Sequence, residues 1–240
     1  MIMQHTVRSY DKELQFLEDK IAHMGGHAER MIESAVQAIV HNDHALAKKV
    51  IKDDAELDKN EREIDEKAIT IIAKRQPMAV DLREIIGAIR ISADLERVGD
   101  MGKNIAKRVG VISELRLPES FYRGLEAFSS LALQQLKDVL DSYANRSLER
   151  ISAVRDRDNE IDAMYTSLFR ELLTFMAESP NNIAVCTHLL FCAKNIERIG
   201  DHATNIAETL YFIMTGGYFE EERPRDDKTH KVGGDALKEL

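Results

Sequence analysis

The hexapeptide Leu95-Glu96-Arg97-Val98-Gly99-Asp100 recurs 101 residues later in the chain, as Ile196-Glu197-Arg198-Ile199-Gly200-Asp201. Four residues past each aspartate stands an asparagine, Asn104 in the first copy and Asn205 in the second, and each is followed by Ile-Ala. Chance rarely repeats polar residues at one fixed offset inside apolar surroundings. The chain is therefore predicted to consist of two copies of one structural unit, each with the same acidic residues.

Prolines and apolar periodicity predict an all-α fold. Pro77, Pro118 and Pro180 stand between long segments in which apolar residues recur every three or four positions, and proline is costly inside a helix. No segment shows the alternation typical of a strand. We predict six helices, at about residues 9–41, 44–74, 79–112, 119–141, 146–177 and 181–215.

The same pattern predicts how the helices are grouped. Short connections between long helices make sequence neighbours antiparallel, so each copy is expected to form an antiparallel three-helix bundle. The first bundle is expected to span residues 1–115 and the second residues 116–216. Residues 217–240 are rich in charge and show no apolar period, so we predict a disordered tail there.

The composition argues against several kinds of partner. The chain has 33 lysines and arginines against 42 aspartates and glutamates, for a net charge of −9. Such an acidic chain is a poor candidate for binding nucleic acid, and no basic cluster suggests direct binding to a membrane. It has no apolar run of about 18 residues, and residues 1–10 lack the apolar core of a signal peptide. We expect a cytoplasmic protein that reaches a membrane only through its partners.

The duplication extends to the middle helix of each bundle, where Glu63-Ile64-Asp65 matches Glu160-Ile161-Asp162. Glu61 and Asp158 stand four positions before these aspartates, and residues four apart lie on one face of a helix. If the second and third helices of a bundle pack side by side, four carboxylates converge in each. The predicted sets are Glu61, Asp65, Glu96 and Asp100, and Asp158, Asp162, Glu197 and Asp201.

Four converging carboxylates need compensating positive charge. A divalent or ferric cation (iron, manganese, magnesium or zinc) could supply it, because oxygen ligands suit hard or borderline metals. Asn104 and Asn205 lie one turn further along and could add neutral oxygen ligands. The open alternative is that the acidic pairs are solvated helix faces, neutralised by Arg97 and Arg198 in surface salt bridges.

Gly99 and Gly200 stand in register inside the third helix of each copy. Glycine inside a helix costs about 1 kcal/mol relative to alanine. Its presence in both copies predicts the close approach of another helix or of a ligand.

Enzyme signatures are not evident in the sequence. Di-iron oxidases built on helical bundles use Glu-x-x-His motifs, and neither copy has a histidine three residues after the glutamate. His202 follows Asp201, but the first copy has Met101 at the equivalent position. No glycine-rich phosphate loop is present. We therefore expect a binding protein and not an enzyme, with a metal-storage or redox protein as the alternative.

These residues resemble the PhoU family of bacterial phosphate-signalling regulators. The stretch from Gln76-Pro77 through Asp81-Leu82-Arg83 to Asp100 is similar to the family's first-repeat signature, and residues 195–208 are similar to its second. The resemblance covers about residues 9–215. It implies a commonly homodimeric adaptor that binds multinuclear metal clusters. It also implies that the adaptor links the phosphate ABC transporter Pst, through the ATPase subunit PstB, to the sensor histidine kinase PhoR.

Carried over to this chain, the resemblance implies a negative regulator of phosphate uptake and of the phosphate-starvation response. The eight carboxylates would bind the metal clusters. Asp158 departs from the pattern, because its side chain is shorter than that of Glu61, and this argues against equal metal occupancy of the two sites. The residues expected to bind partners are Asp81, Arg83, Arg97 and Arg198.

Overall fold

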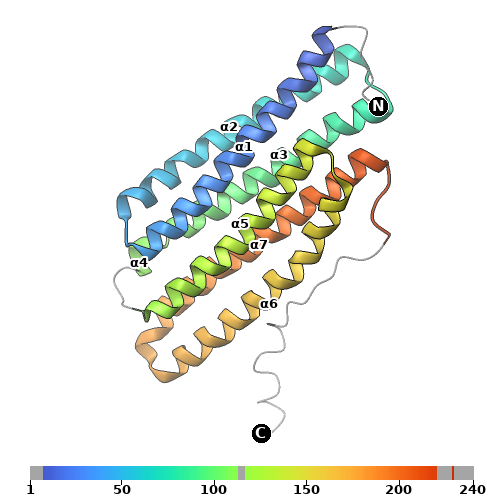
Figure 1. The fold of residues 1–240 in the computed structure, drawn as a ribbon. Coiled ribbons are helices and arrows are strands. Elements are labelled where there is room, and N and C mark those ends of the chain that lie inside the picture. The colour runs from blue at the N-terminus through green and yellow to red at the C-terminus, as the bar shows by residue number, and fades with distance from the viewer. Residues whose placement is uncertain (1–7, 113–116, 221–228, 230–240) are drawn as a thin grey trace.

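A computed structural model describes residues 8–112, 117–220 and 229, and these residues form an all-α structure without strands. Its long helices are drawn in Figure 1. The elements are α1 (Arg8–Val40), α2 (His44–Arg75), α3 (Ala79–Ala106), α4 (Val109–Ile112), α5 (Glu119–Asn145), α6 (Leu148–Glu178), η1 (Pro180–Asn182) and α7 (Ile183–Thr215). The predicted fold class is confirmed.

Local capping residues explain where several helices begin and end. The Asp43 side chain accepts hydrogen bonds from the first backbone amides of α2, and Ser147 does the same for α6. Both residues belong to the preferred helix N-caps. Gly216 ends α7 with a positive φ of 79°, a conformation that glycine adopts without steric cost. Asp43 and Ser147 thus stand directly after the short connections that precede α2 and α6.

The third helix is shorter than predicted, because it ends at Ala106 and not at residue 112. The Arg108 amide donates to the Ile105 carbonyl at 3.0 Å, which tightens the chain into a turn before the separate helix α4. Val109 and Ile112 of α4 are buried. Apolar periodicity therefore continues across the turn, and periodicity alone does not reveal the end of α3.

The two bundles lie side by side, with α3 of the first against α7 of the second (Figure 1). The two helices are antiparallel, because residues later in the sequence of the first bundle contact residues earlier in α7. The contacts that show this are Arg83 with Ile213, Asp94 with His202, and Arg108 with His188. Helices α1 and α5 form the second contact between the bundles. The acidic motifs are thus carried on one continuous scaffold.

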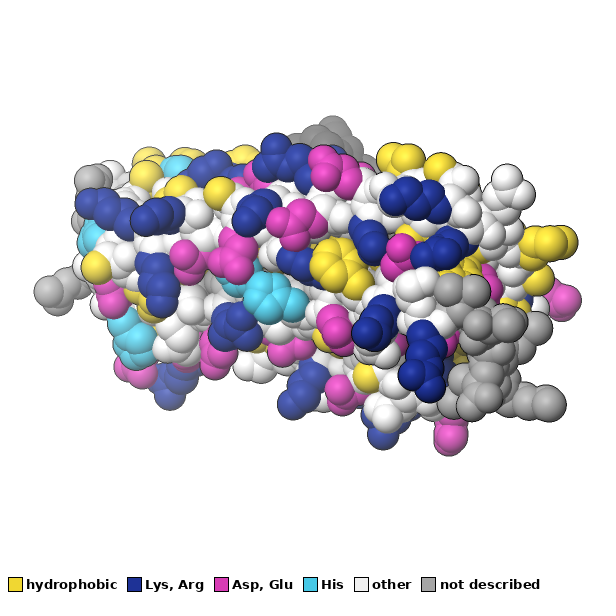
Figure 2. All heavy atoms as spheres, turned by 90° about the horizontal axis from the view of Figure 1, so that it is seen from above, with side chains coloured by type: hydrophobic (Ala, Val, Ile, Leu, Met, Phe, Trp, Pro, Cys, Tyr) yellow, Lys and Arg dark blue, Asp and Glu magenta, His cyan; other side chains and the backbone are white. Residues whose placement is uncertain are grey.

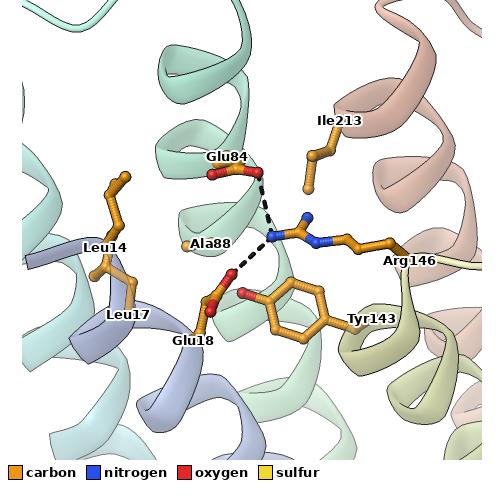
Figure 3. Close-up of a pocket in the computed structure, with 8 residues that line it drawn as sticks. All are labelled: Leu14, Leu17, Glu18, Glu84, Ala88, Tyr143, Arg146 and Ile213. Carbon is orange, nitrogen blue, oxygen red and sulfur yellow. Dashed lines mark hydrogen bonds and ion pairs between the residues drawn. The ribbon is translucent and has the colours of Figure 1, made fainter. Parts of the chain in front are cut away.

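Arg146 connects the end of α5 to the first bundle (Figure 3). It has a positive φ of 53°, and its guanidinium lies 2.8 Å from Glu18 of α1 and 3.2 Å from Glu84 of α3. The guanidinium also packs over the Tyr143 ring, 5.4 Å from its centroid. The left-handed backbone that ends α5 therefore directs one cation onto two helices of the other bundle.

The predicted tail begins with ordered contacts. The Phe219 ring stacks on Tyr211 with centroids 4.0 Å apart, and the Arg155 guanidinium lies 4.0 Å from the Phe219 centroid. The predicted disorder of the rest of the tail falls mainly on residues 221–228 and 230–240, which lie outside the described residues. None of the described helices is long and apolar enough to cross a membrane.

The charged surface shows no segregation by sign in the view of Figure 2. Lysine and arginine side chains alternate with aspartate and glutamate over this face, and apolar side chains lie between them. A mixed surface of this kind fits recognition of specific protein partners better than binding to a polyanion.

Candidate functional site

The first carboxylate cluster lies where α2 packs against α3. Glu61 and Asp65 come from α2, and Glu96 and Asp100 come from α3. Burial raises the pKa of Glu96, and the negative charges of Asp100 and Glu61 raise it further. The pKa of Glu61 is also raised, first by burial and then by Asp65. The two acidic pairs therefore share one electrostatic environment, as their spacing predicts.

Two basic side chains of α3 compensate this cluster. The Arg97 guanidinium lies 3.6 Å from Glu96 and 3.7 Å from Asp100. The Lys103 ammonium lies 2.6 Å from Asp100 and 2.5 Å from buried Asp54. Burial lowers the pKa of Lys103, but hydrogen bonds to Asp100 and Asp54 outweigh this effect and hold the pKa above its usual value. The first cluster is thus neutralised in part by its own helix.

The second cluster, between α6 and α7, contains a deeply buried glutamate. Glu197 is only 6% exposed. Burial raises its pKa, a hydrogen bond from Lys194 lowers it in part, and the charges of Asp201 and Asp162 raise it, so that the pKa lies at about 7. The Lys194 ammonium is 2.8 Å from the carboxylate. Near neutral pH, Glu197 is therefore present in both its protonated and its ionised form.

Asp158 has a different environment from its equivalent, Glu61. It is buried, and its Oδ1 accepts a hydrogen bond from the Thr204 hydroxyl at 3.2 Å. The Thr204 oxygen in turn accepts from the buried Gln135 amide, which also donates to the Val154 carbonyl. Asp158 thus joins a polar network inside the second bundle, whereas Glu61 is partly exposed. The surroundings of Asp158 and Glu61 therefore differ, and the expected difference in metal occupancy stays a prediction.

The lysine of each cluster comes from a different position of the repeat. At the offset of 101 residues, Thr204 stands where the first copy has Lys103, and Ala93 stands where the second has Lys194. The acidic motifs alone do not reveal these two lysines. A position-by-position alignment of the two copies reveals both lysines. In that alignment, each lysine stands opposite a small residue of the other copy.

One carboxylate oxygen in each cluster is buried without a hydrogen-bond partner in the described part of the chain, Oδ1 of Asp65 and Oε2 of Glu197. A buried unpaired polar group costs about 1–3 kcal/mol, which a cation beside it would offset. The oxygen donors also suit such a cation. Across residues 8–112, 117–220 and 229, however, no three His, Cys, Asp or Glu side chains are arranged to hold a metal ion. Metal binding therefore requires side-chain rearrangement and stays a prediction.

The second predicted asparagine contacts the first bundle. The Asn205 amide donates to the Asp94 carboxylate at 3.4 Å, and the His202 imidazole lies 2.8 Å from the same oxygen. Asn104, the equivalent residue of the first copy, is partly buried on α3. His202 has no counterpart in the first copy, where Met101 stands, and its partner Asp94 lies across the contact between the bundles.

The duplicated glycines mark the close approach of neighbouring helices. A Cβ at Gly200 would lie 2.7 Å from the Ile161 side chain of α6 and 3.0 Å from Gln135 of α5. A Cβ at Gly99 would collide with Leu57 of α2. The predicted close packing at both positions is confirmed, and at each position the neighbour is another helix.

Comparison with known protein families matches two PhoU domains, at residues 21–109 and 125–210. The chain belongs to the PhoU family. A "phosphate-specific transport system accessory protein PhoU homolog" of Rhizobium meliloti is 61% identical over 229 residues, covering 95% of this chain and 97% of that protein. The crystal structure of PhoU from Pseudomonas aeruginosa, 33% identical, covers 87% of this chain and 100% of its own and gives a TM-score of 0.83. A PhoU structure from Streptococcus pneumoniae, 27% identical, covers 88% of this chain and 100% of its own, with a TM-score of 0.82.

The four residues expected to bind partners differ in their availability in this PhoU-family chain. Asp81 accepts a hydrogen bond from a tyrosine hydroxyl of α1, and Arg83 donates to the Ile213 carbonyl at 3.2 Å. The Arg97 side chain is 59% exposed, and Arg198 is exposed on α7. Asp81 and Arg83 thus contribute to packing within the chain, whereas the two arginines present positive charge beside the carboxylate clusters.

Proposed function

We propose that this chain is a regulatory adaptor of phosphate transport and phosphate signalling, and not an enzyme. The observation that carries the proposal is the match, over nearly its whole length, to relatives named as accessory proteins of a phosphate-specific transport system. An accessory protein acts through contacts with other proteins, and a rigid helical scaffold presents such contact faces.

The finer proposal names the partners. The chain contacts the ATPase subunit PstB and the kinase PhoR when phosphate is plentiful, and it restrains both phosphate uptake and the starvation response. Two carboxylate clusters, each beside an exposed arginine, provide related docking faces of mixed charge. Complementary charges give such contacts their specificity and their salt dependence. A homodimer would present four such faces.

We expect deletion of this gene to raise alkaline phosphatase activity in phosphate-rich medium, because the kinase would no longer be restrained. A plasmid copy of the wild-type gene should restore repression, whereas R97E combined with R198E should not. R123E is the matched control, because the Arg123 side chain is 71% exposed on α5 and lies in neither acidic motif. Immunoblots would establish equal protein levels. Low activity in the deletion strain would refute the regulatory role and favour the metal-storage alternative.

We further propose that the carboxylate clusters bind metal. Glu61, Asp65, Glu96 and Asp100 would hold it in the first bundle, with Asn104 as a neutral donor. In the second bundle the ligands would be Asp162, Glu197 and Asp201, with Asp158 and Asn205 joining only if they leave their present hydrogen bonds. A bound cation would supply the positive charge that these faces lack and would satisfy the unpaired oxygens of Asp65 and Glu197.

We expect the double variant D100A/D201A to retain less metal than the wild type after purification, measured by elemental analysis. Metal should also raise the melting temperature of the wild type more than that of the variant, by mass action. E119A is the control, because Glu119 is exposed at the start of α5. Equal metal content in D100A/D201A and wild type would refute metal binding at the clusters. A ferrous-oxidation assay separates binding from the redox alternative.

A further inference from the structure

Two histidines and one glutamate meet on the face of the first bundle where α1 packs against α2. His23 and His27 are four residues apart on α1, so they project from one face of the helix, with ring centroids 6.3 Å apart. Glu56 approaches them from α2. One of its carboxylate oxygens lies 3.9 Å from His23 Nε2, and the other lies 4.0 Å from His27 Nδ1. These three residues belong neither to the contacts between the two bundles nor to the carboxylate clusters.

His27 shows that the group is incomplete. His27 is only 7% exposed, and its buried ring nitrogen Nδ1 has no hydrogen-bond partner among the described residues. Buried polar nitrogens are rarely left unpaired in native proteins, so the atom calls for a partner that the protein itself does not supply. His27 and Glu56 both line a hollow of about 280 Å³ between the two helices. The unpaired nitrogen itself is buried, with a carboxylate oxygen of Glu56 4.0 Å away, and the hollow beside these two residues is large enough for an ion and its water.

We propose that His23, His27 and Glu56 form a binding site for a divalent cation of the zinc class. Two donor atoms on one tetrahedral zinc are about 3.3 Å apart, because each lies about 2.0–2.1 Å from the metal. The separations of Glu56 from His23 and His27, 3.9 and 4.0 Å, exceed this value, and the ring centroids of the two histidines are 6.3 Å apart. The three side chains do not yet stand in ligating positions, in keeping with the absence of a preformed group among the described residues.

Ligation requires the exposed side chains of His23 and Glu56 to rotate toward His27. The side chains of His23 and Glu56 are 52% and 57% exposed, so both can move toward the more rigid His27 without disturbing the core. Three protein ligands would then leave a fourth position open toward the hollow, as in zinc sites that keep a bound water.

The surroundings favour zinc over magnesium or calcium. Imidazole nitrogen is a preferred ligand of zinc, cobalt, nickel and copper, whereas magnesium and calcium take oxygen ligands. Asp53 also lines the hollow, one helical turn before Glu56, and Arg30 and Lys49 lie on the same wall. These four charged side chains balance one another in formal charge. Selectivity must therefore come from the imidazole ligands and not from an excess of negative charge.

The site is separate from the carboxylate clusters. Glu56 and Asp65 are nine residues apart on α2, which places them about 180° apart around the helix axis. Glu56 faces α1, whereas Asp65 belongs to the cluster shared with α3. The inference therefore does not depend on the proposed regulatory function and can be tested without it.

The test is a titration of the metal-free, full-length protein with Co²⁺, followed by displacement with Zn²⁺. The visible absorption of Co²⁺ reports its coordination geometry and therefore serves as a spectroscopic probe of the site. We expect H23N and E56Q each to weaken binding at least about tenfold, because even outer-sphere partners of a metal site change affinity by that factor. Both side chains are exposed, so folding should be unaffected, as circular dichroism would verify. Excess Mg²⁺ should not compete.

Two further variants make the result decisive. H41N removes an exposed histidine in the turn after α1 and should bind Co²⁺ like the wild type. D100N/D201N alters both carboxylate clusters and should leave the imidazole-dependent spectrum unchanged. Wild-type affinity in both H23N and E56Q would overturn the proposal. Loss of the spectrum only in D100N/D201N would also overturn it, by assigning the metal to the carboxylate clusters.

Discussion

Replacing Glu197 by glutamine should stabilise the metal-free protein at pH 8 by up to about 3 kcal/mol and leave its stability nearly unchanged at pH 4. The Glu197 side chain is almost completely buried, and its pKa is raised from 4.5 to about 7. Each unit of pKa shift corresponds to about 1.4 kcal/mol between the two protonation states. Glutamine has the same shape as protonated glutamate but never carries the charge.

The direction of the pH dependence follows from proton binding. Between pH 4.5 and about 7 the folded protein keeps the proton on Glu197, whereas the unfolded chain releases it. The folded state therefore binds more protons in this range, and the free energy of unfolding falls as the pH rises. Burial is the main cause, and the charges of Asp201 and Asp162 add to it, while Lys194 compensates only in part.

Urea unfolding of wild type and E197Q in the presence of a chelator, at several pH values between 4 and 8, would measure this effect. The matched control is E96Q in the first bundle. Burial also raises the pKa of Glu96, but its side chain is 16% exposed and lies beside Arg97, so a smaller gain is expected. Equal stability of E197Q and wild type at pH 8 would show that the ionised carboxylate is not destabilising where it lies.

The duplicated motif and the prolines were enough to predict the helices and the pairing of acidic residues on α2 and α3. Spacing along a helix fixes which side chains share a face, and short loops fix which helices are neighbours. Both arguments use only local information. The early end of α3 at Ala106 was not predictable in this way, because the apolar pattern continues into α4.

Local sequence patterns do not predict the contacts between the two bundles. His202 appeared isolated in the sequence because the first copy has no matching histidine, yet its partner is Asp94 of α3. Arg146 likewise pairs with two glutamates of the other bundle. The order of two packed helices and their register are set by side-chain packing over the whole contact, so residues far apart in sequence meet without any repeated signal.

Asp158 shows how the second copy has diverged from the first. Its equivalence to Glu61 is clear from the sequence, but Thr204, in place of a lysine, offers it a hydrogen bond inside the bundle. A carboxylate one methylene shorter also reaches less far toward a shared cluster. The sequence thus predicts which carboxylates are related, whereas the Thr204 hydroxyl fixes where the Asp158 side chain points.

Gly102→Leu should destabilise the protein by about 3 kcal/mol or more, whereas Gly102→Ala should change stability by less than about 1 kcal/mol. A Cβ at Gly102 would lie 3.5 Å from the backbone atoms of Met31 and Ile32 in α1, an ordinary contact distance. Alanine therefore fits, and its better helix propensity offsets any small crowding. The further atoms of leucine would run into backbone that cannot move unless α1 itself is displaced.

Chemical unfolding of both variants followed by circular dichroism would test this difference. Gly124→Leu in α5 is the control, because a Cβ there meets only the end of the Leu168 side chain, at 3.7 Å, and the position is partly exposed. If Gly102→Leu were as stable as Gly124→Leu, the packing of α1 against α3 would be looser than the structure indicates. Because Gly102 faces α1 while Asp100 and Lys103 of the same helix face α2, a displaced α3 would also separate the first carboxylate cluster. Gly102→Leu should therefore lose metal binding at the first cluster, and repression with it, together with stability.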